Sequence, residues 1–271
     1  MGSPVAHSLS PVLHNAAYRA LGLTGWSYER IEADAAALPA LMSTLDDSWV
    51  GLSVTMPGKQ AALSVATDAT DRAVAVGAAN TLVRADSGWR ADCTDVDGVV
   101  GGLRAVGFAG SGYGVVLGAG GTACAVLAGL ADLGLARAYV VAREPARAEP
   151  AVRCAAKLGL PVEVLRWASA PWEELARGAA VLVNTAPAAG IEPHVPALAL
   201  APCVLDVIYH PWPTMLATAV GARGGRLATG LDMLLHQAFG QVEQFTGLNA
   251  PRKVMRDALA AATGGEVPLP L

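Results

Sequence analysis

Hydrophobic and polar positions follow a regular pattern from residue 113 onward, where short β-branched runs alternate with Ala- and Leu-rich stretches of helical length. Strands are predicted over Tyr113–Leu117, Ala138–Ala142, Val162–Leu165, Val181–Thr185, Val204–Ile208 and Arg226–Thr229. Helices are predicted between them, over Thr122–Leu133, Pro150–Leu158, Pro171–Arg177 and Met215–Ala222. Such alternation predicts a doubly wound parallel sheet with helices on both faces.

The first hundred residues are less regular. Their pattern predicts helices over Pro11–Leu21, Lys59–Thr67 and Asp95–Val106, and strands over Val50–Thr55 and Asn80–Arg84. The last forty residues are helical, with one helix over Leu231–Phe245 and another starting after Asn249-Ala-Pro251. We therefore expect an α/β protein with an N-terminal domain over 1–97 and a doubly wound domain over 98–230. Residues 231–271 are expected to form a helical tail that packs back on the first domain.

Composition narrows the class of protein. Apolar residues make up 53% of the 271 residues and the net charge is −4, which excludes a disordered chain and argues against a nucleic-acid partner. The longest uncharged run, over 105–131, is interrupted by glycines, so we expect no membrane segment. The cysteines, at 93, 124, 154 and 203, lack zinc-ligand spacing. We expect reduced thiols, a cytoplasmic location and no metal.

A glycine-rich turn lies between the predicted strand at 113–117 and the helix that follows it. The segment Gly118-Ala119-Gly120-Gly121-Thr122-Ala123 matches G-x-G-x-x-G/A in the strand–turn–helix context that this motif requires. Gly118 permits the tight turn, Gly120 lets the backbone approach a pyrophosphate, and Ala123 permits close packing of helix on strand. The free N–H groups of the helix favour phosphate binding. The segment therefore predicts a dinucleotide site.

The end of the next strand bears on which dinucleotide binds. Arg143 and Arg147 are suited to clamping a ribose 2′-phosphate, which favours NADP. Glu144 would repel that phosphate and instead suits the ribose hydroxyl of NAD. NADP is the expected cofactor, and NAD and a merely solvated charged loop stay open as alternatives.

Lysine is scarce in this chain. Lys59, Lys157 and Lys253 are the only three among 19 cationic residues. Unlike Arg, a Lys side chain can lose its proton in a suitable environment. Lys59 follows a predicted strand end and turn, which makes it a candidate general acid/base, with a surface lysine at a helix start as the alternative.

Short polar motifs run in order along the chain, and together they resemble those of the shikimate dehydrogenase family. His7-Ser-Leu-Ser-Pro-Val-Leu-His-Asn15 is similar to H-S-x-S-P-x-x-H-N, and Ser53-Val-Thr-Met-Pro-Gly-Lys59 to N-V-T-x-P-x-K. Further matches are Gly77-Ala-Ala-Asn-Thr81, Cys93-Thr-Asp95, Asn184-Thr-Ala-Pro187, Asp206-Val-Ile-Tyr-His-Pro211 and Gly230-Leu-Asp-Met-Leu-Leu-His-Gln237, followed by Phe245-Thr-Gly247.

The resemblance implies NADPH-dependent, reversible reduction of 3-dehydroshikimate to shikimate in the biosynthesis of chorismate and aromatic amino acids. It implies that Lys59 and Asp95 form the acid–base pair. It places the substrate carboxylate at Ser8 and Ser10, with Thr55 and Tyr209 at the same end, and the ring hydroxyls at Asn80, Asp95 and Gln237. Residues 1–97 would bind substrate and 98–230 NADP. The implied cofactor contacts are Gly118, Ala119, Gly120, Gly121, Thr122, Ala123, Arg143, Arg147, Thr185, Val207 and Gly230. A monomer or homodimer is expected.

Some positions depart from the family pattern. Ser53 and Cys93 stand where Asn is common, Ala142-Arg143-Glu144 replaces N-R-T, and Val207 replaces Met. A quinate/shikimate or aminoshikimate dehydrogenase with NAD use or relaxed specificity therefore stays open. A non-catalytic regulator that binds a dinucleotide or metabolite is a third hypothesis, against which the retained Lys59 and Asp95 argue.

Three other positions receive structural interpretations. His7 and His14 are expected to fix the local turn and helix, and Asp206 to cap a strand end. The family also has a strand before the segment that matches Gly2-Ser-Pro. We expect either a start of the chain upstream of Met1 or a less stable form that lacks this strand.

Overall fold

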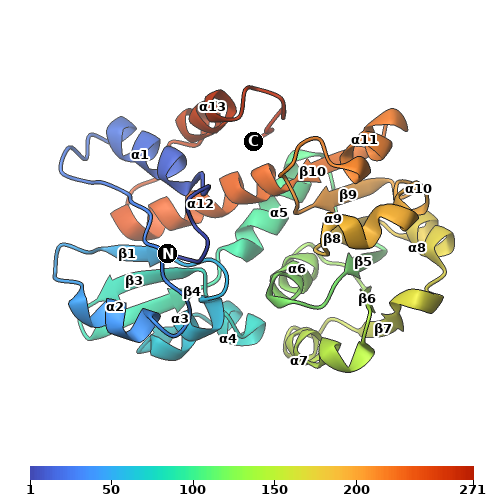
Figure 1. The fold of residues 1–271 in the computed structure, drawn as a ribbon, viewed down its shortest axis with the longest axis horizontal. Coiled ribbons are helices and arrows are strands. Elements are labelled where there is room, and N and C mark those ends of the chain that lie inside the picture. The colour runs from blue at the N-terminus through green and yellow to red at the C-terminus, as the bar shows by residue number, and fades with distance from the viewer. The chain divides into compact units, whose positions relative to one another are not determined.

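The strands of this chain form two separate sheets, one of four strands and one of six. In the computed structural model, which describes residues 1–271, each sheet belongs to its own compact unit (Figure 1). The first unit comprises Met1–Thr94, Leu234–Leu269 and Leu271, and the second comprises Asp95–Met233 and Pro270. The expectation of a two-part α/β fold, whose C-terminal helices return to the N-terminal part, is confirmed.

The sheet of the second unit is parallel throughout, with the order β10-β9-β8-β5-β6-β7. Its strands are β5 (Tyr113–Leu117), β6 (Arg137–Ala142), β7 (Val162–Arg166), β8 (Val181–Asn184), β9 (Cys203–Asp206) and β10 (Arg226–Thr229). The strand order reverses between β5 and β8, which is where open α/β sheets bind their ligands. β8 and β9 are buried along their whole length because helices cover both faces, which explains their continuous apolar runs.

The helices of the second unit fill the intervals between its strands. They are α5 (Asp95–Ala105), α6 (Gly121–Asp132), α7 (Glu149–Lys157), α8 (Trp172–Gly178), α9 (Ala188–Ile191), α10 (Val195–Leu198) and α11 (Met215–Ala222). α6 is buried nearly all round, and its Gly129 packs tightly on α5. A Cβ at Gly129 would lie 2.7 Å from Cγ1 of Val99. Small residues thus let the phosphate-loop helix sit close to its neighbour.

Two predicted strands of this sheet end earlier than their apolar pattern suggests. β9 ends at Asp206 rather than Ile208, because Oδ1 of Asp206 accepts the backbone N–H of Ile208 at 3.2 Å. β8 ends at Asn184, whose Oδ1 accepts the N–H of Ala186 at 3.0 Å. In both cases a polar side chain takes a backbone donor that would otherwise continue the ladder.

The first unit has a mixed sheet with the order β1-β3-β4-β2. Its strands are β1 (Gly51–Ser53), β2 (Asp68–Ala69), β3 (Thr81–Ala85) and β4 (Gly88–Asp92). Its helices are α1 (Ser10–Ala20), α2 (Leu38–Thr44), α3 (Lys59–Val65), α4 (Asp71–Val76), α12 (Gly230–Thr246) and α13 (Arg252–Ala262), of which α12 begins in the second unit. α13 packs on α1, so the C-terminal tail covers the opening helix (Figure 1).

The sequence pattern missed several elements of this unit. α2, α4, β2 and β4 were not predicted, and the predicted strand at 50–55 and helix at 59–67 prove shorter. Local signals for two of them exist. Thr70 caps α4 by accepting the N–H of Ala73 at 3.3 Å, and the two residues between β3 and β4 form a tight turn that ends at Gly88, where φ is +133°.

Met1 and Gly2 lie between the end of β1 and the segment 31–33 and form backbone hydrogen bonds with both. The amine of Met1 donates to the carbonyl of Ser53 at 2.7 Å, and the N–H of Thr55 donates to the carbonyl of Met1 at 2.9 Å. On the other side Gly2 bridges Glu32 in parallel register. Burial lowers the pKa of the Met1 amine to about 6.

None of the helices combines the length and apolar content that a membrane-spanning segment needs.

Candidate active site

Asn80 and Gln237 meet in the interior of the first unit. Asn80 directly precedes β3, just after the left-handed turn at Gly77 (φ +75°), and Gln237 lies on α12. Asn80 Nδ2 donates to Gln237 Oε1 at 3.2 Å, and Asn80 Oδ1 accepts the backbone N–H of Thr94 at 2.7 Å. The two side chains are 3% and 7% exposed. This pair of predicted substrate residues is therefore pre-positioned by hydrogen bonds.

The opening motif places two hydroxyls at a helix start. Ser10 is the first residue of α1, and its N–H donates to Ser8 Oγ at 3.3 Å. Arg30 holds this turn through its Nε and Nη2 groups, both of which donate to the carbonyl of Ser8. The first turn of α1 contains no acidic residue. Half-buried hydroxyls beside a helix N-terminus are suited to binding a carboxylate.

Lys59 begins α3 directly after Gly58, which packs against β1's end. A Cβ at Gly58 would lie 2.9 Å from Val54 Cγ1. The carbonyl of Lys59 accepts the N–H of Ala79 at 2.9 Å, so the start of α3 is tied to the segment that carries Asn80. The side chain of Lys59 is half-buried, while that of Thr55 is exposed. The predicted acid/base and the Asn80 cluster thus share one part of the first unit.

The glycine-rich turn of the second unit joins β5 to α6. Gly118 has φ +98°, and a Cβ there would lie 2.7 Å from Thr185 Oγ1, so only glycine fits. A Cβ added at Gly120 or Gly121 would meet no atom within 4 Å. The first turn of α6 has no acidic side chain. The N-terminus of α6 follows β5, and Thr185 follows β8, the neighbouring strand on the other side of the point where the strand order reverses. The accessible backbone N–H groups at this helix start fit a pyrophosphate.

Asp206 organises the loops at the same edge of this sheet. Its Oδ1 accepts from Asn184 Nδ2 at 2.9 Å, and its Oδ2 accepts from Thr214 Oγ1 at 2.7 Å. Burial raises the pKa of Asp206, and these hydrogen bonds oppose the rise. Asp206 therefore joins the ends of β8 and β9 to the start of α11, which extends the expected role as a strand-end cap.

The remaining predicted cofactor residues lie near this edge or on an exposed turn. Gly230 packs on the loop after β9, since a Cβ there would meet the carbonyl of Val207 and the ring of Tyr209 at 2.2 and 2.7 Å. Burial raises the pKa of Tyr209. Arg143, Glu144 and Arg147 follow β6 on a turn that is largely open to solvent, and Arg147 N–H donates to the Glu144 carbonyl at 2.9 Å.

Asp95 opens α5 in the second unit, directly after Thr94, and is 8% exposed. Its pairing with Lys59 of the first unit stays a prediction. Thr94 itself was not predicted as a site residue. Its hydroxyl lies 3.1 Å from Asn80 Oδ1 and 3.3 Å from Gln237 Oε1, so it completes the Asn80 cluster.

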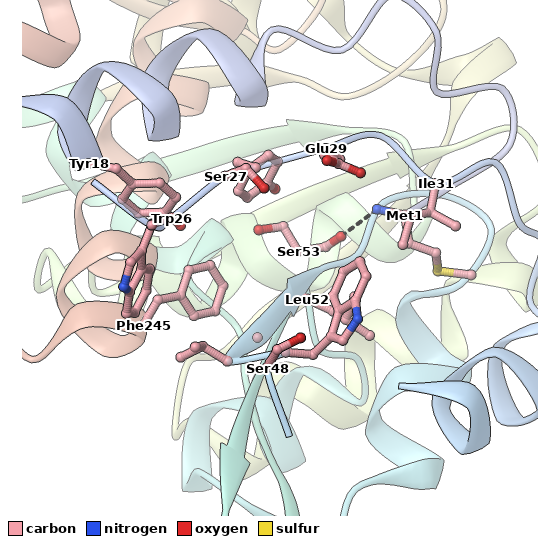
Figure 2. A pocket seen from close by; sticks show the side chains of 15 residues that line it. Met1, Tyr18, Trp26, Ser27, Glu29, Ile31, Ser48, Leu52, Ser53 and Phe245 are labelled. Carbon is pink, nitrogen blue, oxygen red and sulfur yellow. Dashed lines mark hydrogen bonds between the residues drawn. The ribbon is translucent and has the colours of Figure 1, made fainter. Parts of the chain in front are cut away.

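A cavity of about 350 Å³ lies in the first unit and is distinct from the Asn80 cluster. Figure 2 shows the rings of Tyr18, Trp26 and Phe245 grouped at one side of it and Met1 at the other. Ser53, which departs from the family's Asn, lines the cavity and donates to Gln241 Oε1 at 2.9 Å. Sequence reasoning missed Gln241. The available signal was its place four residues after Gln237, on the same face of α12.

His14 is fully buried on α1. Its Nε2 lies 3.2 Å from Gln241 Oε1, and its ring stacks on Tyr28 with centroids 4.2 Å apart. Burial lowers the pKa of His14 to about 3, and the hydrogen bond with Gln241 opposes this shift. The neutral ring fits the expected role in fixing local structure.

Comparison with known proteins gives consistent results along the whole chain. The profile of the shikimate dehydrogenase substrate binding domain matches residues 1–82, and that of the shikimate 5'-dehydrogenase C-terminal domain matches 230–260. The shikimate dehydrogenase (NADP(+)) of Methylobacterium radiotolerans is 38% identical, over 98% of this chain and 96% of its own.

Solved structures agree. The Mycobacterium tuberculosis shikimate dehydrogenase is 53% identical with a TM-score of 0.90, over 96% of this chain and 97% of its own. The Thermus thermophilus shikimate 5-dehydrogenase, solved in complex with NADP(H) and shikimate, is 32% identical with a TM-score of 0.80, again over 96% and 97%. On the strength of its motifs, its fold and these relatives, the chain belongs to the shikimate dehydrogenase family.

Proposed function

We propose that this chain is an NADP-dependent shikimate dehydrogenase, which interconverts shikimate and 3-dehydroshikimate in the biosynthesis of aromatic amino acids. The observation that carries the proposal is the buried Asn80–Gln237–Thr94 cluster beside Lys59, in a chain whose second unit holds a fitting dinucleotide loop. A monomeric or homodimeric cytoplasmic enzyme, with no nucleic-acid or membrane partner, is part of the same proposal.

The substrate residues divide by chemistry. The Ser8 and Ser10 hydroxyls, with Thr55 and Tyr209, would hold the carboxylate, because hydroxyl donors at a helix start match its charge. Asn80, Gln237 and Asp95 would hold the ring hydroxyls. A carboxamide both donates and accepts, so it can pair with a hydroxyl in either sense.

Lys59 and Asp95 would carry the proton. Oxidation of a secondary alcohol requires loss of the hydroxyl proton, which Lys59 Nζ accepts, and the reverse reaction takes the proton back from the same atom. Asp95 would hold Lys59 and the reacting hydroxyl in line, a positioning role that contributes strongly to rate.

The second unit would hold NADP through the backbone of Gly118–Ala123, with Thr185, Val207 and Gly230 at the same edge of the sheet. When bound, NADP would supply the acceptor for the hydride that leaves the alcohol carbon. Arg143 and Arg147 would hold the 2′-phosphate, since two solvent-facing guanidiniums on one turn can donate to it together.

A second candidate is a dehydrogenase with relaxed specificity for quinate, aminoshikimate or NAD. The exposed Glu144 beside Arg143 favours it, because a carboxylate at this position suits a free ribose hydroxyl. A relative from Listeria monocytogenes, 26% identical with a TM-score of 0.81, was solved in complex with shikimate and NAD.

The test is a steady-state assay of nicotinamide reduction with shikimate and with quinate, each with NADP and with NAD. Activity confined to shikimate and NADP is the expected result. Comparable rates with quinate or NAD would favour the second candidate. Absence of turnover with all four combinations, in protein shown to be folded by circular dichroism, would overturn the proposal.

A further inference from the structure

The segment 28–32 holds the chain at both ends of the opening motif. Before the motif, Glu32 Oε2 accepts the backbone N–H of Val5 at 3.0 Å. At the end of the motif, Asn15 Nδ2 donates to the carbonyl of Tyr28 at 3.0 Å, and Asn15 Oδ1 accepts the N–H of Tyr28 at 2.9 Å. The motif is therefore a short span of chain whose two ends are attached to one segment.

Arg30 attaches the middle of this span. Its Nε and Nη2 groups donate to the backbone carbonyl of Ser8 at 3.1 and 2.6 Å. Its neighbours along the chain, Glu29 and Ile31, line the cavity of the first unit instead (Figure 2). Because a guanidinium is a rigid planar fork, two donors that converge on one carbonyl hold it in place better than the flexible ammonium of a lysine.

The start of α1 gives the Ser8 carbonyl no helical partner. The N–H groups of Val12 and Leu13 both donate to the carbonyl of Leu9, at 3.0 and 3.4 Å. Leu9 occupies the N-cap position, and no side-chain hydrogen bond caps the helix there. Such a cap would normally fix how the chain enters a helix. Arg30 supplies this constraint one residue before the cap.

The turn that Arg30 holds carries both hydroxyls that are proposed to bind the substrate carboxylate. The N–H of Ser10 donates to Ser8 Oγ at 3.3 Å, so the position of Ser10 depends on that of Ser8. Both serines are half-buried, whereas Arg30 is exposed. A substitution of Arg30 can therefore loosen the turn without opening a gap in the core.

We infer that Arg30 is a positioning residue for the carboxylate subsite, because its grip on the Ser8 carbonyl keeps the Ser8 and Ser10 hydroxyls in one geometry. The inference rests on the proposed function, which gives the two serines their role. Without Arg30 the turn would have to be ordered each time a substrate binds. That penalty weakens substrate and transition state alike, so it raises KM and leaves kcat nearly unchanged.

The test is Arg30→Met, which keeps an unbranched apolar stem and removes the fork. It should raise the KM for shikimate about three- to tenfold, the usual effect of losing one hydrogen bond. The value of kcat and the KM for NADP should stay within about twofold of wild type. In a Ser8→Ala background, Arg30→Met should have a smaller effect, because Arg30 acts through Ser8.

A second readout compares shikimate with its methyl ester as competing ligands. The ester lacks the charge that the two hydroxyls are placed to bind, so Arg30→Met should weaken the acid more than the ester. Arg19→Met is the matched control, since Arg19 is an exposed arginine in the last turn of α1. It should leave the KM for shikimate unchanged.

Arg30→Lys separates positioning from charge. It keeps the positive charge and loses the fork, so the KM for shikimate should recover little of the loss seen in Arg30→Met. A wild-type KM in Arg30→Lys would overturn the positioning role, because charge alone would then account for the effect.

The remaining outcomes separate the two proposals. A wild-type protein without activity toward shikimate would overturn the proposed function and this inference with it. An active wild type whose KM for shikimate is unchanged by Arg30→Met would overturn the inference alone. Equal weakening of the acid and the ester would also overturn it, because that result assigns Arg30 a general structural role.

Discussion

Asp92 takes two donors from Arg72 in the first unit, with Nε 2.7 Å from Oδ1 and Nη2 2.6 Å from Oδ2. Thr70 and Gln244 donate to the same carboxylate at 2.6 and 2.7 Å. Asp92 thereby joins β4 to the cap of α4 and to α12. Burial opposes ionisation, but these hydrogen bonds and the charge of Arg72 lower the pKa of Asp92 to about 2.

We expect Asp92→Asn to lower the free energy of unfolding by about 2 to 4 kcal/mol, because Arg72 would lose a partly buried counter-ion. Urea unfolding at neutral pH measures this. Asp68→Asn is the control, since Asp68 meets Arg90 as an exposed pair at 3.6 Å and should cost less than about 1 kcal/mol. Equal effects of the two variants would contradict the importance given to Asp92.

Lys59→Ala should reduce kcat by roughly 10²- to 10⁴-fold while shikimate still binds, because the substitution removes the proton acceptor and leaves the Asn80 cluster intact. Steady-state kinetics and calorimetric binding measure the two effects separately. Lys157→Ala, on α7, should leave both unchanged. Near-normal turnover of Lys59→Ala would exclude the proposed proton transfer.

Arg143→Ala should raise the KM for NADP at least about tenfold and change the KM for NAD little, because only NADP carries the phosphate that a guanidinium binds. Glu144→Ala should act in the opposite direction and favour NADP further. Arg153→Ala, at an exposed α7 residue paired with Glu149, is the control. Equal losses with NADP and NAD in Arg143→Ala would assign this residue a structural role.

The fold should lose stability as the pH falls below 6.5, because His14 is held neutral. The pKa of His14 is about 3 in the folded chain and 6.5 for an imidazole in water, so the unfolded chain takes up the proton first. Between pH 6.5 and 3 this group alone should lower the free energy of unfolding by up to about 1.4 kcal/mol per pH unit.

Unfolding in urea at a series of pH values tests this dependence on His14. His14→Gln should flatten the profile in that window, and His7→Gln, at an exposed histidine, should not. An unchanged slope in His14→Gln would show that other groups cause any acid instability.

The second unit was largely predictable from the sequence because its central strands β5, β8 and β9 are buried on both faces. A run such as Val115-Val-Leu117 between helical stretches has few other interpretations, and the strands appear close to where they were predicted. The first unit was harder. β4 and α4 depend on a hairpin turn and a threonine cap, which are single-residue signals without a supporting period.

The candidate site shows the same division. Motifs indicated Asn80, Gln237 and Lys59, and the structure brings Asn80 and Gln237 into contact across 157 residues. Motifs did not indicate Gln241, because its role arises from contacts between distant segments. The bond from Ser53 to Gln241 spans 188 positions, and no periodicity along the chain encodes such a pair.

The buried position of Met1 has a practical consequence for handling the protein. The Met1 nitrogen is buried against the carbonyl of Ser53, at the edge of the cavity lined by Trp26 and Trp49. Any residues that precede Met1 would begin their path at this cavity. An affinity tag therefore belongs after Leu271, which is 52% exposed.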